Sequence, residues 1–106
     1  MSDFIQVTTT ASTKEEAAKI AAALLEQRLA ACAQVVGPVE SHYWWKGAIE
    51  QSTEWLCILK TRREKFSAVE AAIRANHSYE VPEIVACPIE IGSEPYLQWL
   101  RRETAG

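Results

Sequence analysis

The order of two helical patterns among four strand-like segments is the feature that most constrains the fold of this chain. Residues 3–10, DFIQVTTT, are rich in β-branched side chains and predict a first strand. Residues 12–16, STKEE, hold two overlapping capping boxes, Ser12 with Glu15 and Thr13 with Glu16. They predict a helix that starts here and runs to about Leu29, with one apolar face that packs on a sheet.

A bent strand and a long hairpin follow the first helical pattern. Residues 31–40 predict a second strand, interrupted by Gly37–Pro38, which would bend the strand or confine it to a sheet edge. Residues 41–47 and 48–61 predict the two arms of a hairpin that turns around Lys46–Gly47. The middle of the chain is therefore expected to form antiparallel neighbours in one sheet.

The last third of the chain repeats the alternation of helix and strand. Residues 63–76 predict a second helix, 83–91 another strand, and Ser93 is expected to cap a short last helix. The resulting order is β-α-β-β-α-β plus a C-terminal helix. It predicts an α+β fold, a ferredoxin-like sandwich with two helices on one sheet face, as a single domain over residues 1–106.

Composition excludes several classes of function. The chain has 106 residues, of which 48% are hydrophobic and 24% charged, as in globular proteins, and its net charge of −3 does not attract nucleic acid. No apolar run approaches the ~20 residues of a membrane span, and no signal-peptide pattern is evident at the start. Cys32, Cys57 and Cys87 are odd in number and lie among apolar residues, which predicts reduced, buried thiols and a cytoplasmic location.

The tryptophan content predicts self-association. Four tryptophans, Trp44, Trp45, Trp55 and Trp99, are more than the core of so small a chain can enclose. An exposed aromatic sheet face usually meets a partner, so we expect an oligomer.

The segment 76–83, NHSYEVPE, is the main candidate for chemistry, because the chain contains only two histidines. One interpretation is a metal or ligand site built from His77 and the nearby carboxylates of Glu80 and Glu83. The other is a helix exit in which Pro82 leads the chain into the next strand. No second histidine or cysteine lies at ligand spacing, so spacing alone favours the helix exit.

Catalytic machinery is not recognisable elsewhere. The basic run 60–65, KTRREK, lies beside strands that lack the aromatic and basic pattern of RNA-recognition sheets. The segment after the first strand lacks the Gly-rich, arginine-bearing loop of an acylphosphatase, and no G-x-G fingerprint exists. No carboxylate pair has a spacing that sets up acid–base catalysis. We therefore expect neither an enzyme nor an organic cofactor.

Four motifs along the chain resemble the CutA family, the divalent-cation tolerance proteins. They are RLAAC, Y-x-W-x-G-x-I, LKT and H-x-Y-x-x-PE, in the family's order and spacing, and the resemblance extends from Phe4 to about Arg101.

This resemblance implies a homotrimer, similar in architecture to the PII signalling trimers, in which long hairpins pair across subunit edges. It also implies that the motif residues gather around clefts between subunits; these residues are Cys32, Tyr43, Trp45, Lys60, Thr61, Tyr79 and Pro82. The metal expected there is Cu²⁺ or another divalent cation, with His77, Glu80 and Glu83 as candidate ligands.

One departure from the family bears on copper. Where copper-contacting members have a cysteine at the end of the first strand and a His-His pair, this chain has Thr9 and Asn76–His77. Without the thiolate, Cu(I) loses its preferred ligand, whereas Cu(II) can use imidazole and oxygen. Two alternatives stay open: a PII-like trimer that holds a small anion or metabolite through Lys60, Tyr43 and Glu83, and a scaffold for other proteins.

Overall fold

The computed structural model describes residues 2–105 and shows a four-stranded antiparallel sheet with three helices. The elements in chain order are β1 (Phe4–Ala11), α1 (Lys14–Glu26), β2 (Cys32–Trp45), β3 (Ala48–Arg62), the 3₁₀ turn η1 (Arg63–Lys65), α2 (Phe66–Ala75), β4 (Val85–Pro88) and α3 (Glu94–Glu103). The predicted α+β class and the predicted element order are confirmed.

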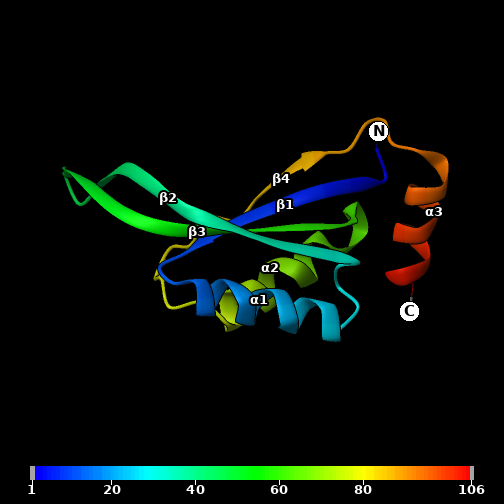
Figure 1. Ribbon diagram of the computed structural model, residues 1–106, viewed down its shortest axis with the longest axis horizontal. Helices are drawn as coiled ribbons and strands as arrows, with labels where there is room; N and C mark the ends of the chain where they lie inside the picture. Colours follow the sequence, from blue (N-terminus) through cyan, green and yellow to red (C-terminus); the bar gives the residue numbers. More distant parts are fainter. Residues whose placement is uncertain (1, 106) are drawn as a thin grey trace.

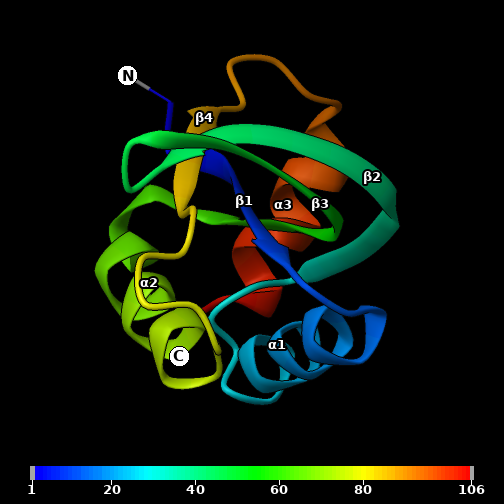
Figure 2. The same ribbon diagram turned by 90° about the vertical axis from the view of Figure 1, so that its left-hand side faces the viewer.

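The sheet places β1 and β3 in its centre and β2 and β4 at its edges, in the order β2-β3-β1-β4. α1 and α2 lie side by side on one face of the sheet, and α3 stands at the end opposite the hairpin tip (Figure 1). The view in Figure 2 shows the same two helices beneath the strands. On the opposite face of the sheet, α3 approaches β1, where the Arg101 guanidinium lies over the Phe4 ring at 5.0 Å.

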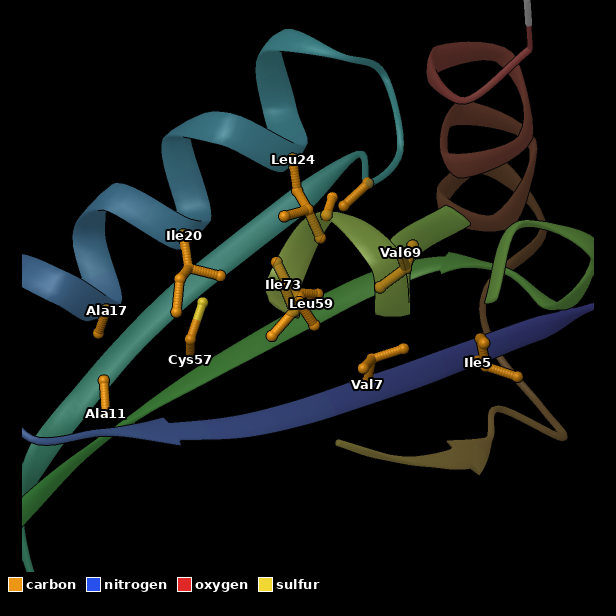
Figure 3. Packing of buried hydrophobic residues seen from close by; sticks show 12 residues of the cluster. Ile5, Val7, Ala11, Ala17, Ile20, Leu24, Cys57, Leu59, Val69 and Ile73 are labelled. Atoms are coloured by element: carbon orange, nitrogen blue, oxygen red, sulfur yellow. The ribbon is translucent and has the colours of Figure 1, made fainter. Parts of the chain in front are cut away.

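The buried core lies between the sheet and the two helices (Figure 3). β1 and β3 supply alternate residues to it because successive side chains on a strand point to opposite faces. Its largest fully buried apolar side chains are Ile20, Leu24, Leu59, Ile73, Val7 and Val69. Each such side chain stabilises the fold by about 1.5–3 kcal/mol relative to an exposed one.

α1 is shorter than the sequence predicts. Thr13 caps it, since its Oγ1 accepts a hydrogen bond from the Glu16 amide at 3.0 Å. The helix ends at Glu26 rather than near Leu29, because Arg28 takes a positive φ of 58° that reverses the chain. The carboxylate of Glu16 bonds outside the helix, as described below.

The middle of the chain forms one hairpin of two long strands, and β2 lies at the edge of the sheet, as the interruption at Gly37–Pro38 predicts. β2 is continuous, and a register shift between Val36 and Val39 absorbs Gly37–Pro38 as a bulge. Gly37 lies so close to the Trp55 ring that a Cβ there would come within 2.7 Å of it. The turn at Lys46–Gly47 has φ values of 50° and 83°, as a two-residue hairpin turn requires.

The C-terminal elements differ from the prediction mainly in length. α2 begins at Phe66 after η1, and β4 spans only Val85–Pro88 instead of 83–91, since only these residues pair with β1. α3 is fastened to β3 because Arg62 donates from Nε to Thr104 Oγ1 at 3.0 Å and from a terminal nitrogen to the Thr104 carbonyl at 2.7 Å.

Several large apolar side chains remain exposed in the single chain. Trp44 on the hairpin is 71% exposed, Ile49 opposite it 65%, and Ile91 after β4 90%. The outer edges of β2 and β4 have no strand partner within residues 2–105. No helix among these residues is long and apolar enough to cross a membrane.

Candidate functional site

The candidate segment connects α2 to β4 and passes the C-terminal end of β1 and the first turn of α1. Asn76 ends α2, and its side-chain amide donates to the Ala72 carbonyl at 2.8 Å. Ser78 then donates through its hydroxyl to Glu16 Oε1 at 3.1 Å. Pro82 is buried and turns the chain toward β4. The connection is therefore attached to α1, and its course is visible between α2 and β4 in Figure 2.

Both ring nitrogens of His77 are engaged by the backbone. Nε2 lies 2.6 Å from the Thr10 carbonyl oxygen, and Nδ1 lies 3.1 Å from the Tyr79 amide nitrogen. A carbonyl only accepts and an amide N–H only donates, so Nε2 carries the proton and Nδ1 accepts. The side chain has no exposed surface, and Glu16 Oε1 lies 3.4 Å from Nδ1.

A buried carboxylate meets the same segment from the hairpin. The Tyr79 hydroxyl donates to Glu54 Oε2 at 2.7 Å, and Glu54 is only 6% exposed. No ion pair to Glu54 exists in the described part of the chain, so the phenol is its hydrogen-bond donor. Burial and the hydrogen bond to Glu54 raise the pKa of Tyr79 well above its usual range.

The sequence did not reveal the roles of Glu16 and Glu54. Glu16 matched a capping box, yet its carboxylate bonds Ser78 on a segment 62 positions later. Glu54 was one of several carboxylates without a meaningful spacing, and it meets Tyr79 only because the fold brings the hairpin beside the α2–β4 connection. The one feature of the sequence that could have pointed to Glu54 is its position directly before the apolar run 55–59, where a charged side chain is unexpected.

The predicted metal ligands do not form a cation site within one chain. Among residues 2–105, no three His, Cys, Asp or Glu side chains come close enough together to hold a metal ion. Glu80 and Glu83 are exposed, whereas both nitrogens of His77 are occupied. Thr9 is fully buried with its Oγ1 unpaired. The residues of a single chain therefore do not fit a copper site, and metal binding stays a prediction.

The predicted cleft residues fall into separate parts of the molecule. Cys32 and Lys60 face each other on paired strands near α3, where Lys60 Nζ donates to Gln34 at 2.9 Å. Tyr43 lies roughly 35 Å farther along β2, beside Trp45 near the hairpin tip, at the usual rise per strand residue.

The fold also places the three remaining members of that set. Tyr79 and the buried Pro82 lie in the α2–β4 connection, and Thr61 is fully buried on the core face of β3. Only an association of several copies could bring the exposed members together.

The three cysteines are free, but their burial differs from the prediction. Cys57 is buried in the core, and burial raises the pKa of its thiol to about 11, which makes it a poor nucleophile. Cys32 is half-buried, and Cys87 on the edge strand β4 is exposed. The expectation of a buried thiol is therefore wrong for Cys87 in the single chain, because β4 has no neighbour on its outer side.

Comparisons with known proteins address the family directly. The family described as "CutA1 divalent ion tolerance protein" matches residues 5–103. The chain is 47% identical over 100 residues to the divalent-cation tolerance protein CutA of Archaeoglobus fulgidus, covering 94% of this chain and 95% of the relative. It is 40% identical over 100 residues to the chloroplastic protein CutA 1 of rice, covering 94% of this chain but only 56% of the longer plant protein.

Solved structures agree with these sequence matches. The structure of the A. fulgidus protein, described as periplasmic, has a TM-score of 0.93 at 43% identity and covers 96% of this chain and 99% of that one. A divalent cation tolerance protein from Thermus thermophilus also has a TM-score of 0.93, at 41% identity and the same coverage. One of these relatives is described as periplasmic and another as chloroplastic, so a cytoplasmic location of this chain stays a prediction. The chain belongs to the CutA1 divalent ion tolerance family.

Proposed function

We propose that this protein acts in divalent metal-ion tolerance as a non-enzymatic homotrimer with a ferredoxin-like subunit. The family match over residues 5–103 is the observation that carries the tolerance role. The element order and the strand order β2-β3-β1-β4 support the ferredoxin-like plan.

Self-association is supported by the surface that a single chain leaves open. Trp44 and Ile49 project from the hairpin, and both sheet edges are free within residues 2–105. Beside β4 lies an open groove of about 540 Å³, lined by Ile5, Arg63, Phe66, Ile84, Val85, Ala86 and Pro88. An apolar groove along a free strand edge suits a strand from another copy, which would pair with the edge and cover the groove.

Cation contact in this proposal is weak and is shared between subunits. Glu80 and Glu83 offer exposed carboxylates, which bind divalent cations through oxygen. Cu²⁺ remains the first cation to test because the family resemblance implies it. A neighbouring subunit must supply further ligands, because one chain brings no ligand cluster together in its described part.

The alternative of a small-anion site has less support. Its proposed residues Lys60 and Tyr43 lie far apart, and Lys60 is bonded to Gln34. The groups around the candidate segment are the carboxylates Glu16 and Glu54, which repel anions.

Two measurements test the proposal. Native mass spectrometry is expected to give three copies of the 11.9 kDa chain, and a monomer would contradict the shared site. Isothermal titration with Cu²⁺ is expected to show saturable binding that the double variant Glu80→Gln, Glu83→Gln weakens. Glu26→Gln, at the exposed end of α1, is the matched control for loss of surface charge. Equal affinity of both variants would exclude the two carboxylates as ligands.

A further inference from the structure

His77 occupies a position that is unusual for a metal ligand, because it completes the hydrogen bonding of a sheet edge. β4 pairs with β1 only over Ile5–Thr8, so the last residues of β1 have no strand on that side. The Thr10 carbonyl lies in this unpaired stretch, and His77 Nε2 reaches it at 2.6 Å. The imidazole thus takes the place of a missing strand amide.

The second ring nitrogen fixes the chain that follows. Nδ1 accepts a hydrogen bond from the Tyr79 amide. The ring centroids of His77 and Tyr79 lie 4.8 Å apart, with the ring planes tilted by 48°. This arrangement turns the Tyr79 side chain toward the hairpin, where its hydroxyl meets Glu54 at 2.7 Å. One imidazole therefore links the end of β1, the α2–β4 connection and, through Tyr79, β3.

We propose that His77 is a positioning residue and not a metal ligand: as the Nε2–H tautomer it bridges Thr10 and the Tyr79 amide and thereby holds the Tyr79 hydroxyl on Glu54. To bind a cation, the ring would have to give up one of two backbone partners and leave a buried polar group unpaired. Neither ring nitrogen is accessible, since the side chain has no exposed surface. Glu16 Oε1, 3.4 Å from Nδ1, already accepts from Ser78.

This inference deepens the proposed function, since it rests on the same segment and assigns any cation contact there to the oxygens of Glu80 and Glu83. It does not depend on cation binding for its own evidence. The tautomer and the position of Tyr79 can be measured in the protein without metal.

The first test is nitrogen NMR of the two histidines in the native oligomer. His77 is expected to show a protonated Nε2 and an unprotonated Nδ1. On addition of Zn²⁺, which is diamagnetic and does not broaden nearby signals, the ring-nitrogen shifts of His77 should stay unchanged, whereas the exposed ring of His42 is accessible to the cation. A protonated Nδ1 on a neutral His77 ring, or a change of its ring-nitrogen shifts to those of a metal-bound imidazole, would overturn the proposal.

The second test compares His77→Gln with His77→Ala. Glutamine retains one donor and one acceptor at the end of a side chain, so it can serve both backbone partners, whereas alanine serves neither. Exchange of the Tyr79 amide hydrogen should speed up at least about tenfold in His77→Ala, as loss of one hydrogen bond implies, and much less in His77→Gln.

The two variants also separate the inference from the proposed function. If the wild-type protein binds no Cu²⁺, the proposed cation contact fails while the tautomer and the glutamine rescue remain valid tests. If His77→Gln protects the Tyr79 amide no better than His77→Ala, the positioning role is refuted whatever the cation result. Should His77→Ala not fold, the tautomer of the wild-type protein and its response to Zn²⁺ still test the proposal.

Discussion

The bond between Tyr79 and Glu54 is expected to be a measurable source of stability. Tyr79→Phe removes only the hydroxyl and leaves the Glu54 carboxylate, 6% exposed, without its phenol donor. A hydrogen bond to a charged group contributes about 1.5–3 kcal/mol, and a stranded buried acceptor costs a similar amount. We therefore expect Tyr79→Phe to lower the free energy of unfolding by about 2 kcal/mol.

The assay is a double-mutant cycle in urea at fixed protein concentration, because stability of an oligomer depends on concentration. It combines Tyr79→Phe with Glu54→Leu, which removes the acceptor of the hydrogen bond and keeps a side chain of similar volume. The coupling energy between the two changes should be at least about 1 kcal/mol, as expected for residues in contact. Tyr43→Phe is the matched control: its hydroxyl meets Ser52 at 3.2 Å on the exposed hairpin, so its effect should stay below about 0.5 kcal/mol.

A coupling energy within about 0.3 kcal/mol of zero would refute this reasoning, because changes at independent sites add within that error. An effect of Tyr43→Phe as large as that of Tyr79→Phe would also count against it. The stability would then come from tyrosine hydroxyls in general and not from the buried carboxylate.

Three further predictions concern the core, the bulge and alkaline pH. Gly37→Ala should destabilise the fold by about 1–3 kcal/mol in urea unfolding, because the new Cβ would lie 2.7 Å from the Trp55 ring, and an unchanged midpoint would show that the ring moves freely. Thr9→Val and Thr61→Val should each stabilise by about 1 kcal/mol in the same assay, since each removes a buried hydroxyl without a partner, and a loss of stability would reveal a partner for the hydroxyl. Because the folded-state pKa of Tyr79 is raised, its neutral phenol stabilises the fold fully below the unfolded pKa of about 10, and this contribution is lost as pH rises through the folded pKa. The stability difference between wild type and Tyr79→Phe should therefore shrink above about pH 10, and a constant difference would contradict the assignment.

Local patterns in the sequence predicted the elements of the fold but not their ends. The cap at Thr13 and the turn at Lys46–Gly47 depend on neighbouring residues only, and both are confirmed. The ends of β4 depend on where β1 offers a partner, so 83–91 was too long a prediction. The bulge at Gly37–Pro38 keeps β2 continuous because β3 pairs on both sides of it, which the sequence of β2 alone does not show.

The candidate site was predicted in location and not in chemistry. His77 and Tyr79 stood out because histidine is rare in the chain and the family motif contains both residues. Their partners Thr10, Glu16 and Glu54 lie between 25 and 67 positions away, and no spacing rule connects them. Every residue has a backbone carbonyl, so the sequence does not reveal which one accepts a hydrogen bond from His77. The helix-exit and metal-site interpretations of the segment 76–83 therefore could not be separated from the sequence.

The unequal edges of the sheet have a consequence for the geometry of assembly. β2 presents a free edge of 14 residues and β4 one of 4, so pairing the β2 edge of one copy with the β4 edge of the next joins two different surfaces. Such a head-to-tail contact either closes into a ring or continues as a filament, depending on the rotation between neighbours. In this mode of pairing, the bulge at Gly37–Pro38 lies within the pairing strand, and because a bulge bends its strand it would influence that rotation. The close packing of Gly37 on the Trp55 ring would then help to determine whether the copies close into a ring or extend as a filament.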